Sequence, residues 1–252
     1  MDVTFATEPT PGRLNEDHVL ASPAYVVVLD GATVPAGVRT GCVHGVLWLV
    51  RNLGDLLANG LSGNDRAPLA EVLAEAITEL RDRHAGACDL TDPDTPSATV
   101  ALLRAAGETL DYLVLCDSFV VVDGGFGLQV VTDDRTARLP AYDAVSVATL
   151  RNAPGGFWVA SADPAAAGYA LTGSVPLRDV RRAALLSDGA ARSVERFGRT
   201  WEQVLTLAGE AGPRAVIEEV RRGEQDDVGR RWRGKRFDDA TLAYCTFPSA
   251  GT

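Results

Sequence analysis

Three short apolar runs in the chain end on an aspartate that is followed by a small residue. In a fourth place the order is reversed, and two adjacent aspartates precede the apolar run. Runs of this length, rich in β-branched residues and bounded by Gly, Asp or Pro, predict strands with a carboxylate at one end. The four places are VVVLDG around Asp30, LVLCDS around Asp117, ALLSDG around Asp188 and DDATLAYC from Asp238.

The order of predicted elements indicates an α+β domain. Two helical segments follow the second predicted strand region, and the later runs are joined by tight turns such as Asp123-Gly124-Gly125. Hairpins of this kind favour antiparallel sheets over a βαβ alternation. Predicted strands are Tyr25–Leu29, Ala98–Leu103, Leu110–Cys116, Phe119–Asp123, Leu128–Thr132, Ala183–Leu186 and Thr241–Cys245, and predicted helices are Val38–Leu57, Ala67–Arg83, Trp201–Ala211 and Arg214–Arg222. We expect one domain over residues 1–252, with residues 139–179 as an inserted lobe.

The four carboxylate positions are expected to gather along one sheet edge. In an antiparallel sheet, a strand that runs in the opposite direction begins at the edge where its neighbours end. Several carboxylates that lie close together stay ionised only when a cation offsets their repulsion. Hard divalent cations such as Mg²⁺ or Mn²⁺ take oxygen ligands of this kind. The alternative is that each aspartate only caps a turn before Gly or Ser.

Composition narrows the classes of partner and compartment. The chain has 34 acidic and 24 basic residues and a net charge of -10, which argues against a nucleic-acid or anionic-membrane binder. The N-terminus lacks the pattern of a secretory signal, and no apolar run is long enough to span a bilayer. Four widely spaced cysteines predict reduced thiols in a cytoplasmic protein, and neither the cysteine nor the histidine spacings predict a zinc site.

A series of short motifs in a fixed order resembles the metal-dependent type 2C serine/threonine protein phosphatases. The resemblance covers nearly the whole chain, and its strength lies in the ordered set. The motifs are Arg13-Leu14-Asn15-Glu16-Asp17, Asp30-Gly31, Pro96-Ser97-Ala98-Thr99, Cys116-Asp117-Ser118 in place of the usual Gly-Asp-Ser, Thr132-Asp133-Asp134, Leu186-Ser187-Asp188-Gly189 and Asp238-Asp239-Ala240-Thr241.

The resemblance implies a four-layer αββα sandwich of two antiparallel β-sheets flanked by helices. It also implies a phosphomonoester hydrolase with two or three Mn²⁺ or Mg²⁺ ions, in which a metal-bridging hydroxide attacks phosphorus in line. The implied substrate is a phosphorylated protein or a small phosphorylated molecule. By the resemblance, Asp30, Asp188 and Asp238 hold the first metal. Asp30 bridges to a second metal, which Glu16 or Asp17 and the Gly31 carbonyl support. Asp117 belongs to a third metal site, and Arg13 binds phosphate.

The chain departs from the family pattern in ways that leave alternatives open. Arg13 lies three residues before Glu16, whereas the family spacing is four, and Ala32-Thr33-Val34-Pro35 replaces the residues that often follow Asp-Gly. The Leu-Gly-Asp that usually precedes the late strand is not evident between Tyr169 and Asp179. A phosphatase-like regulatory module that binds a phosphorylated partner is therefore a second hypothesis. The basic run from Arg230 to Arg236 is expected to be a surface loop that attracts phosphate.

Overall fold

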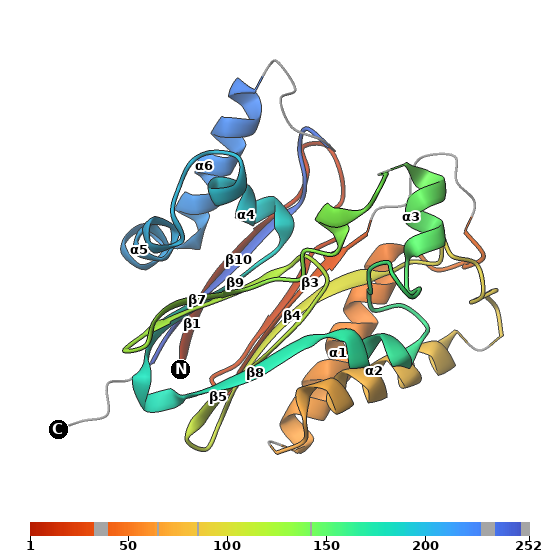
Figure 1. The fold of residues 1–252 in the computed structure, drawn as a ribbon, viewed down its shortest axis with the longest axis horizontal. Helices are drawn as coiled ribbons and strands as arrows, with labels where there is room; N and C mark the ends of the chain where they lie inside the picture. Colours follow the sequence, from red (N-terminus) through yellow and green to blue (C-terminus); the bar gives the residue numbers. More distant parts are fainter. Residues whose placement is uncertain (33–39, 65, 85, 142, 228–234, 248–252) are drawn as a thin grey trace.

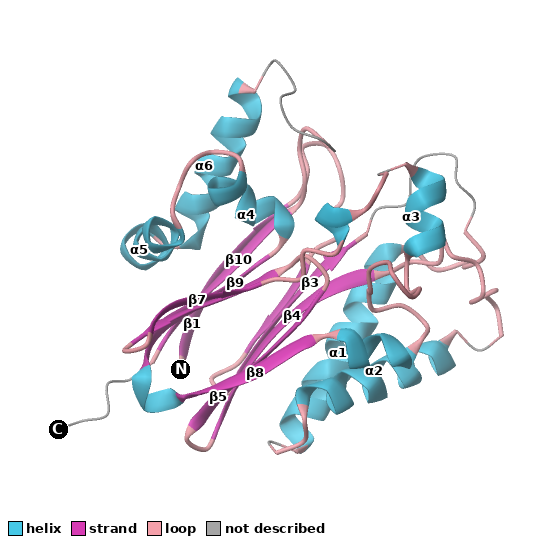
Figure 2. Ribbon diagram, viewed as in Figure 1, coloured by secondary structure: helices cyan, strands magenta, loops and turns pink. Residues whose placement is uncertain are grey.

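The computed structural model describes residues 1–252 except 33–39, 65, 85, 142, 228–234 and 248–252. Two antiparallel sheets of five strands each form its centre (Figures 1 and 2). One sheet has the order β1-β10-β9-β6-β7 and the other has the order β2-β3-β4-β5-β8. The strands are β1 Asp2–Glu8, β2 His18–Ala21, β3 Tyr25–Gly31, β4 Ala98–Ala106, β5 Thr109–Leu115, β6 Phe119–Gly124, β7 Gly127–Val131, β8 Leu171–Pro176, β9 Val180–Leu186 and β10 Ala240–Thr246.

Helices cover the outer face of each sheet and complete four layers (Figure 1). One hydrophobic cluster packs α1 and α2 against β3, β4 and β5, and a second packs α4, α5 and α6 against β6, β9 and β10. This is the αββα sandwich that the sequence resemblance implied. The helices are α1 Val46–Gly63, α2 Leu69–Arg83, α3 Ala144–Leu150, α4 Asp188–Glu195, α5 Trp201–Ala211 and α6 Pro213–Asp226, with short 3₁₀ turns η1 Thr136–Arg138, η2 Pro164–Tyr169 and η3 Leu177–Asp179.

The alternation of side chains along β3 explains how one strand serves two cores. Val26 and Val28 are fully buried in the cluster between the two sheets, whereas Val27 and Leu29 are fully buried against the helices. Because side chains alternate along a strand, Asp30 continues the row of Val26 and Val28. Its carboxyl group therefore stands at the end of the inter-sheet core, on the side of the opposite sheet.

The predicted helix Val38–Leu57 begins later than expected. In the structure, α1 begins at Val46, and Gly45 before it is extended (φ -96°, ψ 175°). Residues 40–45 form a turn in which Thr40 Oγ1 donates to the Cys42 carbonyl (2.9 Å). Local side-chain bonding of this kind competes with helix formation, which is why the helical periodicity was misleading here.

Two other expectations bear on the regions around the sheets. The segment 139–179 contains α3, η2, all of β8 and η3, so it also adds an edge strand to one sheet. Most of the basic run lies outside the described residues; its last two members, Lys235 and Arg236, are described. None of the described helices has the length and apolar content needed to cross a membrane.

Candidate metal centre

Aspartates from both sheets meet at one end of the sandwich. Asp30 ends β3, and Asp117 follows β5, which runs in the same direction as β3 because β4 lies antiparallel between them. Asp188 follows β9 in the other sheet, and Asp238 precedes β10, which is antiparallel to β9. The sequence argument placed all four along the edge of one sheet. The structure instead divides them two and two between facing sheets.

Asp30 lies at the centre of this acidic group. Its pKa is raised well above the usual range, first by burial and then by the charges of Asp17, Asp188, Asp238 and Asp117, in that order. Five carboxyl groups thus interact electrostatically, although they come from five separate parts of the chain. Such a set holds its full negative charge only when cations share the site.

Asp17 is the most enclosed of these acids. Burial raises its pKa to about 7, and the charges of Asp239 and Asp188 add to the shift, while hydrogen bonds from Thr241 and Ser187 oppose it. Ser187 Oγ donates to Asp17 Oδ2 (2.9 Å). The second oxygen, Oδ1, is buried and has no hydrogen-bond partner in the described part of the chain. An unpartnered buried carboxylate oxygen in an acidic cluster is a ready ligand for a cation.

A buried arginine holds Asp238 in place. Arg192 is 1% exposed and lies on α4, one turn after Asp188. Its Nη2 donates to Asp238 Oδ2 (2.8 Å), and its Nη1 donates to Glu224 Oε1 (2.5 Å). Lys235 Nζ donates to the other Asp238 oxygen (3.1 Å). Burial and the charge of Asp188 nevertheless raise the pKa of Asp238. A buried arginine gives no sequence signal, so sequence reasoning missed this residue.

Asp117 stands at the border of the cluster. Thr136 Oγ1 donates to Asp117 Oδ2 (3.0 Å), and burial raises the pKa of Asp117, with a smaller contribution from the charge of Asp133. Asp133 itself is buried and accepts two hydrogen bonds from Arg135 Nε (both 2.8 Å). Asp133 is therefore neutralised by a cation of the chain, whereas the side-chain partners of Asp117 among the described residues are the neutral Thr136 hydroxyl and Cys116 thiol.

The N-terminal motif is fastened to the cluster through its backbone. Asp239 accepts hydrogen bonds from the backbone N–H groups of Thr10 (2.6 Å) and Glu16 (2.5 Å). A Cβ atom added to Gly31 would lie 2.6 Å from the Glu16 carbonyl oxygen, so Gly31 and Glu16 are in close contact. Arg13 is exposed on the same segment, and its guanidinium makes no ion pair with a described residue. Its side chain is therefore available to an anion.

Cys116 has an unusual backbone for its residue type. Its φ is 70°, in the left-handed region that favours glycine. The strand β5 ends one residue earlier, and the turn at Cys116 directs the chain to Asp117. The glycine that the phosphatase motif usually carries at this position thus has a conformational reason. Here the buried Cys116 side chain packs with Phe157 and Val159 instead.

A model of the protein phosphatase 2C family matches residues 12–220. The chain belongs to the protein phosphatase 2C family. As a member it is classed as a metal-dependent protein phosphatase, and this bears out the resemblance seen in the motifs. No curated protein matches the sequence.

Solved bacterial structures share the fold at low sequence identity. PppA, described as a key regulatory component of T6SS in Pseudomonas aeruginosa, is 17% identical with a TM-score of 0.61, covering 98% of this chain and 97% of that one. The PPM Ser-Thr phosphatase MsPP from Mycobacterium smegmatis, in complex with cacodylate, is 17% identical with a TM-score of 0.58, covering 97% of each chain. The catalytic domain of the phosphatase PstP, in complex with two manganese ions, is 16% identical with a TM-score of 0.57, covering 96% of each.

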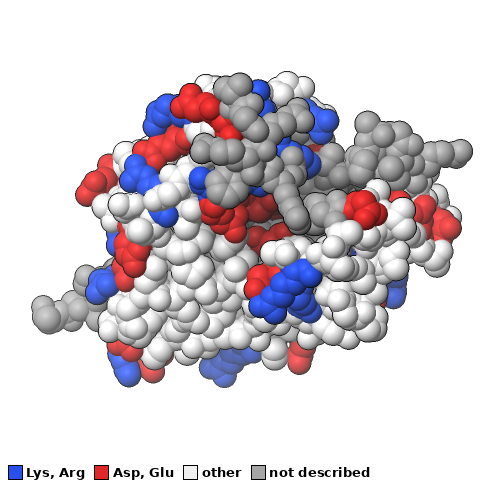
Figure 3. Space-filling model, turned by 45° about the horizontal axis from the view of Figure 1, so that its top comes forward, with Lys and Arg blue, Asp and Glu red and all other residues white. Residues whose placement is uncertain are grey.

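The donor set of this phosphatase 2C family member suits hard divalent cations. Asp17, Asp30, Asp188 and Asp238 offer only oxygen atoms, and each has a pKa raised by burial. Mg²⁺ and Mn²⁺ prefer such ligands and keep part of their water shell. Figure 3 shows acidic atoms gathered in a recess on one face of the molecule, with basic side chains beside them.

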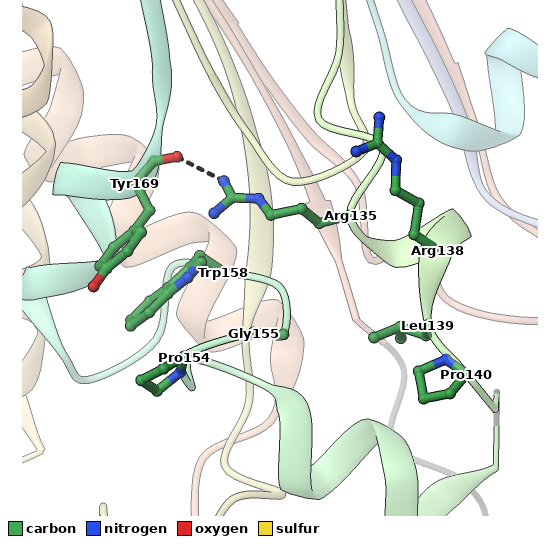
Figure 4. Close-up of a pocket in the computed structure, with 9 residues that line it drawn as sticks. Arg135, Arg138, Leu139, Pro140, Pro154, Gly155, Trp158 and Tyr169 are labelled. Atoms are coloured by element: carbon green, nitrogen blue, oxygen red, sulfur yellow. Dashed lines mark hydrogen bonds between the residues drawn. The ribbon is translucent and has the colours of Figure 1, made fainter.

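A pocket of about 420 Å³ lies beside the cluster rather than in it. Figure 4 shows Arg135 extending toward Tyr169, whose ring is stacked on that of Trp158 with 3.6 Å between centroids, and Arg138 with Leu139 and Pro140 on the other side. Arg135 links the two regions, because it binds Asp133 and also donates to the Tyr169 carbonyl (2.7 Å). The pocket thus adjoins the Asp117 side of the cluster and is lined in large part by the segment 139–179.

The structure brings together a group of metal-ligand side chains that the sequence did not predict. The spacings of cysteine and histidine predicted no zinc site, yet Cys42, His44, His84 and Cys88 bring four ligand atoms within 4.8 Å of one another. They do so because the turn before α1 and the turn after α2 lie side by side. The local signals are a Cys-x-His pair and a His-x₃-Cys pair, 40 residues apart at His44 and His84.

Proposed function

We propose that this chain hydrolyses phosphoserine or phosphothreonine on a protein substrate, with Mn²⁺ or Mg²⁺ held by Asp17, Asp30, Asp188 and Asp238. The observation that carries the proposal is the mutual rise in pKa among these carboxyl groups, which meet from two facing sheets. Ions bound there would acidify a water molecule for in-line attack on phosphorus and neutralise the phosphoryl oxygens. The named solved relatives, one of them bound to two manganese ions, support this assignment.

The remaining residues of the site have supporting roles in this proposal. Glu16 lies against Gly31, and Glu16 with the Gly31 carbonyl would serve the second ion, while Asp117 would serve a third. Arg13 would bind the phosphate of the substrate, because a guanidinium pairs with two phosphate oxygens at once. Arg192 touches no substrate in this scheme and acts by positioning Asp238.

We also propose that the chain works as one domain in which residues 139–179 shape the approach of the substrate. The pocket between Arg138 and Trp158 supports this role, because it combines cationic and aromatic walls beside Asp117. A phosphorylated peptide has both the charge and the length to reach from the carboxylates to this pocket. Unbonded thiols at Cys42 and Cys88 support a reducing compartment, the cytoplasm.

The test compares hydrolysis of an aryl phosphate and of a phosphothreonine peptide with Mn²⁺ present. Asp30→Asn and Asp188→Asn are expected to lose activity on both substrates. Asp143→Asn is the matched control, because Asp143 caps α3 far from the cluster in sequence and asparagine caps helices equally well. Full activity in the first two variants would exclude the proposed centre. Turnover of the aryl phosphate without the peptide would assign a small phosphorylated substrate instead.

A further inference from the structure

A second group of ligand-type side chains lies apart from the carboxylates. Cys42 and His44 belong to the turn that leads into α1, and His84 and Cys88 belong to the turn that follows α2. The two helices are adjacent and antiparallel, so the start of one lies beside the end of the other (Figure 1). None of the four residues has a part in the proposed hydrolysis.

Three sulfur–nitrogen distances among the ligand atoms match a tetrahedral metal site. Cys42 Sγ lies 3.6 Å from His44 Nδ1 and 3.5 Å from His84 Nδ1, and Cys88 Sγ lies 3.4 Å from His44 Nδ1. With Zn–S near 2.3 Å and Zn–N near 2.0 to 2.1 Å, a tetrahedron places sulfur and nitrogen about 3.5 Å apart. The two sulfur atoms are 3.2 Å apart, well beyond the length of about 2.05 Å of a disulfide bond but shorter than the about 3.8 Å between two sulfur atoms on a tetrahedral zinc ion. Zinc binding therefore requires the two thiolates to move apart by about 0.6 Å.

The surroundings orient these ligands. Backbone N–H groups of Val43 and His44 donate to the sulfur atoms of Cys88 and Cys42, at 3.4 and 3.3 Å. Such bonds stabilise thiolates, the form in which cysteine binds metal. The ring of Trp48 stacks on His44 with 4.0 Å between centroids, which fixes the plane of that imidazole.

The backbone also brings the two turns into direct contact. The Asp89 N–H donates to the Gly41 carbonyl (2.8 Å), and a Cβ atom on Gly41 would lie 2.5 Å from the Asp89 carbonyl oxygen. Cys42 and His84 are buried, and His44 and Cys88 are partly exposed. The ligands are therefore gathered by the fold itself, with one side open to solvent for entry of an ion.

We propose that Cys42, His44, His84 and Cys88 form a structural zinc site that joins the start of α1 to the end of α2. Two thiolates and two imidazoles in a tetrahedral arrangement are a donor set that zinc prefers over Mg²⁺ or Mn²⁺. On binding, the two cysteine thiols release their protons to solvent and the ion takes their place. Four protein ligands fill the coordination sphere, so the site has no position for a substrate.

A zinc ion at this site would also support the acidic cluster, because two of its ligands lie on segments of the chain that lead to and from residues of that cluster. Cys42 lies 11 residues after Gly31 in the sequence, and Cys88 lies 10 residues before Ala98, the first residue of β4, which pairs with Gly31. Zinc would thus hold both connections that leave this part of the cluster. Its role is structural support, distinct from the proposed hydrolysis.

The experiment measures zinc in the full-length protein purified under reducing conditions and dialysed against a weak chelator. Elemental analysis is expected to find one zinc ion per chain, which Cys88→Ser and His84→Ala lose. Cys245→Ala is the matched control, because Cys245 is buried in the inter-sheet core, and it is expected to retain zinc. Asp30→Asn is likewise expected to retain zinc while losing phosphatase activity, so the two proposals fail separately.

Cobalt substitution of the wild-type chain gives a second readout that does not depend on how the variants fold. Co²⁺ at this site is expected to show the intense visible bands of tetrahedral coordination and a thiolate charge-transfer band, which carboxylate-bound Co²⁺ lacks. Absence of that band together with absence of zinc would overturn the proposal. A Cys42–Cys88 disulfide in the reduced preparation, detected by peptide mass, would overturn it as well.

Discussion

Replacing Asp17 with asparagine is expected to stabilise the metal-free protein while removing its metal-dependent activity. Folding raises the pKa of Asp17 from 3.8 to about 7 because the side chain is buried among other acids. Each pKa unit corresponds to about 1.36 kcal/mol, so the ionised carboxylate costs the folded, metal-free protein about 4 kcal/mol. The neutral asparagine avoids this cost, and its carbonyl oxygen accepts the same hydrogen bond from Ser187.

The sign of the pH dependence follows from the raised pKa. The folded state holds the proton of Asp17 more tightly than the unfolded state, so the protonated side chain stabilises the folded wild type. This contribution is complete below about pH 4 and is lost as the pH rises through about 7. At about pH 8, Asp17→Asn is therefore expected to unfold at a Tm about 8 to 16 °C above that of the wild type, since about 1 kcal/mol shifts Tm by roughly 2–4 °C at this size. At about pH 4 the two Tm values are expected to agree.

The assay is thermal unfolding in EDTA, followed by circular dichroism at both pH values. Asp123→Asn is the opposite control: although burial opposes it, hydrogen bonds and charges from Arg182 and Arg181 lower the pKa of Asp123, so this variant should lose stability at the higher pH. Addition of Mn²⁺ should stabilise the wild type and have a smaller effect on Asp17→Asn. The reasoning is refuted if Asp17→Asn is no more stable than the wild type in EDTA at the higher pH.

Three further substitutions test how the site is supported. Arg192→Met removes the buried cation that Glu224 and Asp238 share, leaving them only Arg221 and Lys235 respectively, and should cost up to about 3–5 kcal/mol of unfolding free energy, measured by urea denaturation. Gly31→Ala places a methyl group against backbone, so it should lower the free energy of unfolding by about 1–3 kcal/mol and weaken Mn²⁺ binding measured by calorimetry. Its control is Gly45→Ala, whose methyl group meets open space and should change stability little. Asp239→Ala leaves two backbone N–H groups without their acceptor and should weaken Mn²⁺ binding, although Asp239 is outside the proposed ligand set. Unchanged binding would contradict the role of Asp239 in holding the N-terminal motif against the acidic cluster.

The sequence predicted the central strands well and the outer elements poorly. All seven predicted runs are strands; six have a continuous apolar character that reflects burial on both faces, whereas the edge strand β7 was found because it follows the Asp123-Gly124-Gly125 turn signal. The strands β1, β2 and β8 were missed; they lie at sheet edges and expose much of their length, so their residues carry no strong pattern. The short helix α4 was missed as well, since it begins on a residue that had already been interpreted as a strand end, Asp188.

The two candidate metal sites differ in how visible they are in the sequence. Each aspartate of the acidic cluster stands at a strand terminus, so a local pattern identifies it and antiparallel pairing brings it to a common end of the fold. Cys42 and Cys88 occupy irregular turns whose proximity depends on the packing of α1 against α2. No local pattern encodes that packing, and the same holds for the pairing of Arg192 with Asp238.

The division of the acidic cluster between two sheets makes the distance between its halves a property of the core. Asp30 and Asp117 move with one sheet and Asp188 and Asp238 with the other, and facing sheets are held about 10 Å apart by the side chains between them. The inter-sheet core therefore acts as a spacer for the ions. A change of side-chain volume in the inter-sheet core, such as Val28→Ala, would therefore alter metal affinity without changing any metal ligand. Core residues that never contact the substrate would in this way affect catalysis.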